Sequence, residues 1–366
     1  MMAPLGAGHH HARGVTPPRH RSLHWKKMAR NWDGVNVVAE LPRFRDVGAN
    51  WLANGMDKTR DDRTTIMLAH EVEEIVGPTR LSRLHETVVG GPVTIQYVTS
   101  TNETLRLNYN DLQLVVAAHR VIGCWEAAHA SPPTTILEIG GGYGGLAVKL
   151  RRQWPLARYV IVDLEEAQVL QSYYLDACER TQAGQLPDGT PSLHSLGCID
   201  LVGVDQLQSI EQQSWDLVIN MRSMQEMDPP EIARYFRFLQ STVRIGGIFY
   251  NVNRFLTGST GIPIHASRYP YDDRWRVVGV APFPTQSVQL EVVTQRRALP
   301  DPVGRRFIRA LPANYVWQTG LWGALMRPLQ FLDQLFATHA SILWTPVKRL
   351  MRSLRLIHLE KGPTHT

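Results

Sequence analysis

One glycine-rich segment constrains the fold more than any other part of this 366-residue chain. Residues 134–150 read TTILEIGGGYGGLAVKL. The apolar run Ile136–Ile139, which contains a single acid, predicts a buried parallel strand, and the glycines at 140–145 predict a tight turn into an apolar helix. Such a strand, turn and helix let the backbone approach a nucleoside-bearing ligand and direct the N–H groups of the helix N-terminus toward it.

The glycines alone do not identify that ligand, because the turn fits two patterns. One is the G-x-G-x-x-G of dinucleotide-binding turns, with Gly145 as its last glycine, and the other is G-x-G-x-G, ending at Gly144. Glu138 discriminates between them, since a carboxylate there repels an anionic pyrophosphate and attracts a cation. S-adenosylmethionine carries a sulfonium and an amino group, and E-x-G-x-G-x-G resembles motif I of class I methyltransferases. The residues that this resemblance assigns to the cofactor are Glu138, Gly140, Gly142, Tyr143 and Gly144.

The segments after the turn alternate between strand and helix patterns, which predicts an α/β fold with a mostly parallel sheet. The stretch Asp228-Pro229-Pro230-Glu231 is typical of a helix start. Two adjacent strand patterns, 275–280 and 288–295, have no helix between them and therefore predict an antiparallel hairpin. Class I methyltransferases end in such a hairpin, so we expect their Rossmann-like sheet. The other predicted strands are 159–164, 201–204, 215–220 and 246–252.

The flanks of this pattern differ from it in composition. Residues 1–22 are rich in Gly, Pro, His and Arg, which predicts a disordered basic tail. Residues 23–130 are mostly helical in pattern and predict an N-terminal cap before the methyltransferase core at 131–300. Residues 301–366 predict a basic helical C-terminal extension, which can lie on an anionic membrane, dock on its own core or contact a second copy in a homodimer.

The net charge of +6 is divided unevenly along the chain. Residues 1–32 carry six Lys and Arg and no acid, residues 301–366 carry nine against three acids, and the middle is net acidic. Nucleic-acid enzymes surround the active cleft with positive charge, so this distribution argues against DNA or RNA as a partner. Three widely spaced cysteines and the absence of an apolar run of about 18 residues predict a cytoplasmic protein.

Acidic and polar residues follow the predicted strands where an open α/β sheet binds its ligands. Asp163 closes the second strand, 23 residues after Gly140, and is placed to accept hydrogen bonds from ribose hydroxyls, with helix capping as its alternative role. Leu164 and Asp205 are the neighbouring candidates for cofactor contact. The stretch 216–227, DLVINMRSMQEM, predicts that Asn220 lines the cofactor site.

Several of these pieces together resemble the bacterial family of sugar O-methyltransferases. They are ILEIGGGYGGLA, the VDL-E and SYYL pieces at 163–175, DLVIN..SMQEM and FYNVNR, and they cover roughly residues 131–255. The resemblance implies transfer of a methyl group from S-adenosylmethionine to a sugar hydroxyl, in polysaccharide or glycoside biosynthesis. The acceptor is then a sugar or glycan that is free, nucleotide-linked or lipid-linked.

Methyl transfer to a sugar hydroxyl needs an aligned acceptor and a base that removes the hydroxyl proton. Glu226 is the first candidate base, followed by Asp228, whose alternative role is helix capping, and His265 in the loop after the fifth strand. No ligand spacing demands a metal. The residues expected to contact the acceptor are Ser223, Gln225, Asn253 and Arg254.

Two other functions stay open at this stage. If G-x-G-x-x-G is the operative pattern, the chain is an NAD(P)-dependent sugar-modifying oxidoreductase. If catalysis has been lost, the chain is a methyltransferase-like binding subunit.

Overall fold

The computed structural model describes residues 36–46, 61–86, 88–183, 199–211, 214–254, 256–257 and 264–301, all of which lie within one compact unit, residues 1–308. The expected tail at 1–22 and the extension from residue 302 onward lie outside these ranges. Within the described ranges, no helix combines the length and apolar character that crossing a bilayer requires.

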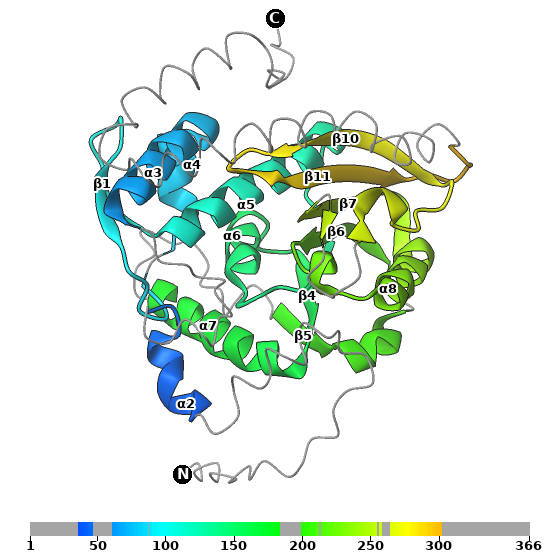
Figure 1. Cartoon of the computed structure of the whole chain (residues 1–366), viewed down its shortest axis with the longest axis horizontal. Helices are drawn as coiled ribbons and strands as arrows, with labels where there is room; N and C mark the ends of the chain where they lie inside the picture. Colours follow the sequence, from blue (N-terminus) through cyan, green and yellow to red (C-terminus); the bar gives the residue numbers. More distant parts are fainter. Residues whose placement is uncertain are drawn as a thin grey trace, which may run out of the picture. The chain divides into compact units, whose positions relative to one another are not determined.

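A seven-stranded mixed sheet forms the centre of the fold (Figure 1). Its order is β10-β11-β7-β6-β3-β4-β5, in which β7, β6, β3, β4 and β5 pair in parallel and β11 pairs antiparallel with both β10 and β7. The sequence prediction of a Rossmann-like methyltransferase sheet that ends in an antiparallel hairpin is confirmed. The strands are β3 (Thr135–Ile139), β4 (Arg158–Asp163), β5 (Ile199–Gly203), β6 (Trp215–Met221), β7 (Val243–Arg254), β10 (Trp275–Phe283) and β11 (Gln286–Arg296).

Helices cover both faces of the sheet. One face packs on α5, α6 and α7, and the other packs on α8, where the Phe236 ring lies 5.9 Å from that of Phe249 on β7. The sequence predicts a loop insertion at 180–198, but residues 180–183 are helical, because α7 continues to Ala183. The helices of the core are α6 (Gly145–Gln153), α7 (Glu165–Ala183) and α8 (Pro229–Thr242), and the short 3₁₀ helices are Val204–Ile210, Met224–Glu226 and Ala266–Arg268.

The residues before the sheet form the expected helical cap in their described part. Asp61 begins α3 by accepting a hydrogen bond from Thr64 N at 2.8 Å, and Asn108 begins α5 in the same manner. Within this mostly helical segment, the strand patterns at 93–98 and 104–107 predict a short hairpin, and the antiparallel pair β1–β2 confirms it. The elements of the cap are α2 (Val37–Glu40), the 3₁₀ helix Leu41–Arg43, α3 (Asp62–Val76), α4 (Pro78–Leu84), β1 (Ile95–Val98), β2 (Thr104–Leu107) and α5 (Tyr109–Ala128). Outside the cap, the short strands β8 (Leu256–Thr257) and β9 (Ile264–His265) follow β7 and pair with each other.

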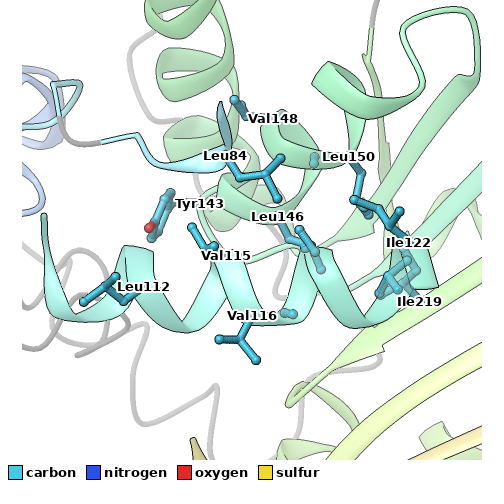
Figure 2. Close-up of a cluster of buried hydrophobic side chains, with 14 of the residues drawn as sticks. Leu84, Leu112, Val115, Val116, Ile122, Tyr143, Leu146, Val148, Leu150 and Ile219 are labelled. Atoms are coloured by element: carbon cyan, nitrogen blue, oxygen red, sulfur yellow. The ribbon is translucent and has the colours of Figure 1, made fainter. Parts of the chain in front are cut away.

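The cap and the sheet share one apolar core. Figure 2 shows side chains of α5 and α6 together with Ile219 of β6 and with Tyr143 from the glycine turn. A buried ion pair lies in the same contact: Lys149 Nζ on α6 is 2.6 Å from Asp111 Oδ1 on α5 and also donates to the Leu84 carbonyl oxygen at 2.8 Å. The helix that follows the glycine turn is therefore fixed to the cap by both apolar and ionic contacts.

Candidate active site

The glycine turn lies at the carboxyl end of β3, in the middle of the sheet, and its backbone follows the G-x-G-x-G pattern. Gly140, Gly142 and Gly144 have φ values of 73°, 59° and 94°, and α6 begins immediately after Gly144. A Cβ atom on Gly140 would lie 2.2 Å from Ser223 Cβ, so the turn packs against the segment that follows β6. The turn thus leaves the N-terminus of α6 directed toward the carboxyl edge of the sheet.

Asp163 lies beside this turn at the end of β4. Its Oδ1 accepts a hydrogen bond from Leu164 N and its Oδ2 accepts one from Gln171 Nε2, both at 2.8 Å. Burial raises the pKa of Asp163 to about 6, although these bonds and the backbone N–H groups of Gly141 and Gly142 favour its charged form. The carboxylate therefore holds the turn against β4, and its contact with a ribose stays a prediction.

Gln171 is a residue of this site that the sequence prediction missed. It is fully buried on α7, and its Nε2 also donates to the Gly142 carbonyl oxygen at 2.9 Å. One amide group thus joins the turn to Asp163. The sequence could have revealed this residue, because Gln171 is a polar residue on the apolar face of α7, between Leu170 and Tyr174.

The environment of Glu138 corrects the expected charge at the strand end. Its side chain is buried beneath the turn, and Tyr159 Oη donates a hydrogen bond to Glu138 Oε2 at 2.8 Å. Burial, with a contribution from Asp163, raises the pKa of Glu138 to about 8 despite this bond. Burial thus favours the protonated carboxyl of Glu138, whereas the sequence argument assumed a free carboxylate facing a cation.

Tyr143 was expected to contact the cofactor, but its side chain packs into the helical cap. The ring is 3% exposed and lies 4.9 Å from the ring of Tyr174 and 5.5 Å from that of Phe44. The Arg45 guanidinium stacks over it at 5.2 Å, and Asn110 Nδ2 donates to its hydroxyl at 3.3 Å. A local motif does not reveal this direction, since the packing partners come from distant segments.

The polar residues after β6 and β7 come together, as the sequence predicted. Asn253 Nδ2 donates to Asn220 Oδ1 at 2.8 Å and to Asn251 Oδ1 at 2.6 Å, and Asn253 Oδ1 accepts from Gln225 N at 2.9 Å. Ser223 Oγ donates to the Ile139 carbonyl oxygen at 2.8 Å. These groups are satisfied by one another, so they fix the loop that follows β6, a structural role that the sequence argument did not expect.

Two further bonds complete this network. Asn220 Nδ2 donates to the Ile139 carbonyl oxygen at 2.9 Å, and Gln225 Oε1 accepts from Arg254 N at 2.9 Å. The Arg254 side chain itself is exposed at the end of β7. Contacts of Asn220 with the cofactor, and of Ser223, Gln225, Asn253 and Arg254 with an acceptor, stay predictions.

Glu226 ends the short 3₁₀ helix in the loop after β6. Burial and, to a lesser extent, Asp163 raise its pKa to about 7, while Arg254 and Arg222 lower it. A carboxyl group with a pKa near neutrality is suited to accept a proton in a reaction at that pH. This raised pKa favours Glu226 among the three candidate bases.

The structure gives less support to the other two candidate bases, Asp228 and His265. Asp228 stands at the N-cap of α8, but no hydrogen bond from the helix backbone reaches its side chain, so the expected capping bond is not formed. His265 pairs through its backbone with Leu256, and its side chain lies outside the described part.

Of the two remaining cofactor candidates, Asp205 is exposed in the 3₁₀ helix after β5, and Leu164 is buried next to Asp163. Nowhere in the described ranges do three or more His, Cys, Asp or Glu side chains gather as metal ligands do.

No protein-family model and no curated protein matches this chain. Among solved structures, an O-methyltransferase family protein from Burkholderia thailandensis is similar at 14% identity, over 52% of this chain and 58% of its own, with a TM-score of 0.39. Human N-acetylserotonin methyltransferase in complex with SAM is 13% identical over 51% of this chain and 54% of its own, with a TM-score of 0.32. PigF with SAH is 15% identical over 51% and 58%, with a TM-score of 0.34. The matches span little more than half the length of these proteins, and likenesses this distant do not assign an activity.

Proposed function

We propose that this chain is an S-adenosylmethionine-dependent O-methyltransferase that methylates a sugar hydroxyl in polysaccharide or glycoside biosynthesis. The observation that carries the proposal is the site at the carboxyl edge of β3, β4 and β6. There a G-x-G-x-G turn, Asp163 and a partly exposed Glu226 lie within electrostatic reach of one another. The antiparallel β11 next to β7 supports a methyltransferase over a dinucleotide-binding oxidoreductase, whose second half continues with parallel βα units.

The residues divide the reaction between them. The turn and the N-terminus of α6 would hold the cofactor, which supplies the activated methyl group when bound. The acceptor would lie beside the loop after β6, which the amide network of β6 and β7 holds in place. Glu226 would take the hydroxyl proton as the acceptor oxygen attacks the methyl group. Because its pKa is near 7, its carboxyl is mostly deprotonated above that pH and can accept a proton.

Calorimetry with S-adenosylhomocysteine tests the cofactor assignment. We expect wild-type protein to bind it, and Asp163→Asn to bind it more weakly by about 1–3 kcal/mol because ribose contacts are lost. Asp200→Asn is the matched control, since Asp200 forms an exposed ion pair with Arg158 early in β5. Absence of binding to the wild type at millimolar ligand, or binding of NADH in its place, would refute the proposal.

A further inference from the structure

Arg222, directly after β6, has an unusual backbone conformation for its residue type. Its φ is 68°, and in the described part of the chain the only other non-glycine residue with positive φ is Asn102 in the β1–β2 turn. Asparagine adopts this region readily, whereas for arginine it is strained. The Arg222 N–H donates to the Val252 carbonyl oxygen at 2.7 Å, so the conformation is fixed by pairing with β7. Strain of this kind is retained where the side chain must be aimed at a particular place.

The Arg222 guanidinium is held by neutral groups. Its Nη1 donates to Gln113 Oε1 on α5 and to Gln286 Oε1 at the start of β11, both at 3.3 Å. No carboxylate within 4 Å pairs with it among the described residues. Arg45 and Lys149, by contrast, are buried cations that each have a carboxylate partner, at 2.9 Å and 2.6 Å. Glu226 interacts with Arg222 electrostatically but forms no direct ion pair with it, and a half-buried cation without a close counter-ion is costly unless a ligand supplies the charge.

Gln113 gives a second and independent indication of a ligand, because one of its hydrogen-bond donors has no acceptor. Its side chain is 1% exposed, and its Oε1 already accepts from Arg222 and from Gln286 Nε2. Its Nε2 is buried without a hydrogen-bond partner in the described part of the structure. Buried amide donors are normally satisfied, so an orphaned donor next to a cation that forms no direct ion pair indicates a binding place for a group rich in oxygen acceptors.

The position of this cluster assigns it to one half of the site. Asp163 follows β4, on one side of β3, whereas Arg222 follows β6 on the other side and reaches Gln286 at the start of β11. If the ribose lies at Asp163, the cluster lies at the acceptor. We propose that Arg222, held by Gln113 and Gln286, binds a carboxylate or phosphate group of the acceptor, which is therefore an acidic sugar. This rests on the proposed methyl transfer and names its substrate class.

An anion at Arg222 would also affect the candidate base. Arg222 lowers the pKa of Glu226, four residues further along the chain. A bound carboxylate or phosphate offsets that positive charge, so the Glu226 carboxylate becomes more basic when an acidic acceptor is in place. The cluster would thus both select the acceptor and strengthen proton removal from it.

The test is calorimetric titration of full-length protein saturated with S-adenosylhomocysteine. The probes are glucuronate, glucose 6-phosphate and neutral glucose. We expect saturable binding of at least one anionic probe and at least tenfold weaker binding of glucose, and the better anion identifies carboxylate or phosphate as the preferred group. Arg222→Gln and Arg222→Gly should each weaken anion binding tenfold or more. Arg276→Gln, on the exposed side of β10, should not.

The glycine variant keeps the test interpretable, because glycine adopts φ near 68° without strain and should leave the melting temperature unchanged or higher. Equal binding of glucuronate, glucose 6-phosphate and glucose to the wild type, or unaltered anion binding by Arg222→Gly, overturns the proposal. A tenfold loss of S-adenosylhomocysteine affinity in Arg222→Gly, with 5′-methylthioadenosine affinity unchanged, would place Arg222 at the cofactor carboxylate and also overturns it. Failure of the wild type to bind S-adenosylhomocysteine would instead contradict the proposed function itself.

Discussion

The two halves of the candidate site are built differently. On the β4 side, the backbone of the glycine turn sets the shape, and Asp163 with Gln171 fixes it. On the β7 side, amide side chains of β6 and β7 hydrogen-bond one another and the backbone of Gln225, and so determine where the loop after β6 lies. A half that depends on backbone conformation can be recognised in the sequence by the spacing of its glycines. A half that depends on a side-chain network shows in the sequence only as a group of polar residues. The first half suits one constant cofactor, and the second can be altered residue by residue to suit an acceptor.

Glu226 joins the two halves, since Asp163 raises its pKa and Arg254 and Arg222 lower it. We expect Glu226→Gln to reduce turnover by about 10²–10⁴-fold, because the base is lost. Wild-type turnover should rise with pH through about 7, as the carboxyl deprotonates, and the variant should lack this rise. Transfer of labelled methyl groups to free, nucleotide-linked and lipid-linked sugars measures both effects. Glu211→Gln, at an exposed position, is the control, and a variant with wild-type turnover would exclude Glu226 as the base.

The next largest effect is expected from disturbing the contact between the two halves, where Gly140 packs against Ser223. Gly140→Ala places a Cβ atom 2.2 Å from Ser223 Cβ at a φ of 73°, so we expect a loss of about 3 kcal/mol or more of unfolding free energy. Gly246→Ala is the matched control, because Gly246 has a φ of 86° with nothing within 4 Å of its Cβ position. It should cost about 1–2 kcal/mol, from backbone strain alone. Equal losses in denaturant melts would show that the two halves do not depend on this close approach.

The smallest effects should separate the halves. Asn253→Ala removes three hydrogen bonds of the amide network, and Gln171→Ala removes the two that join the turn to Asp163. Each should cost about 1–3 kcal/mol of stability, since buried partners are left unsatisfied. We expect only Gln171→Ala to weaken S-adenosylhomocysteine binding in calorimetry, and Asn253→Ala to keep it within about threefold. The reverse result would mean that the amide network, not the turn, forms the cofactor site.

The same difference explains which features the sequence revealed. The strand, the positive-φ glycines and the 23-residue spacing to Asp163 are local or nearly so, and they were predictable. The hairpin was predictable as a pair, but its insertion with β11 next to β7 required the folded sheet. The direction of the Tyr143 side chain was not predictable, because Phe44 and Tyr174, which hold its ring, come from segments far along the chain. Arg222 was missed because its φ and its amide partners exist only after α5 and β11 have docked.

The ion pair between Lys149 and Asp111 has a practical consequence for dissecting this molecule. A recombinant fragment that begins at residue 131 would lose Asp111 and the Leu84 carbonyl, which accept hydrogen bonds from Lys149, together with the α5 side chains that cover α6. Water would then reach the apolar face of α6, which begins immediately after the glycine turn, and exposed apolar surface destabilises the fold. The sheet and the segment that precedes it must therefore be expressed together.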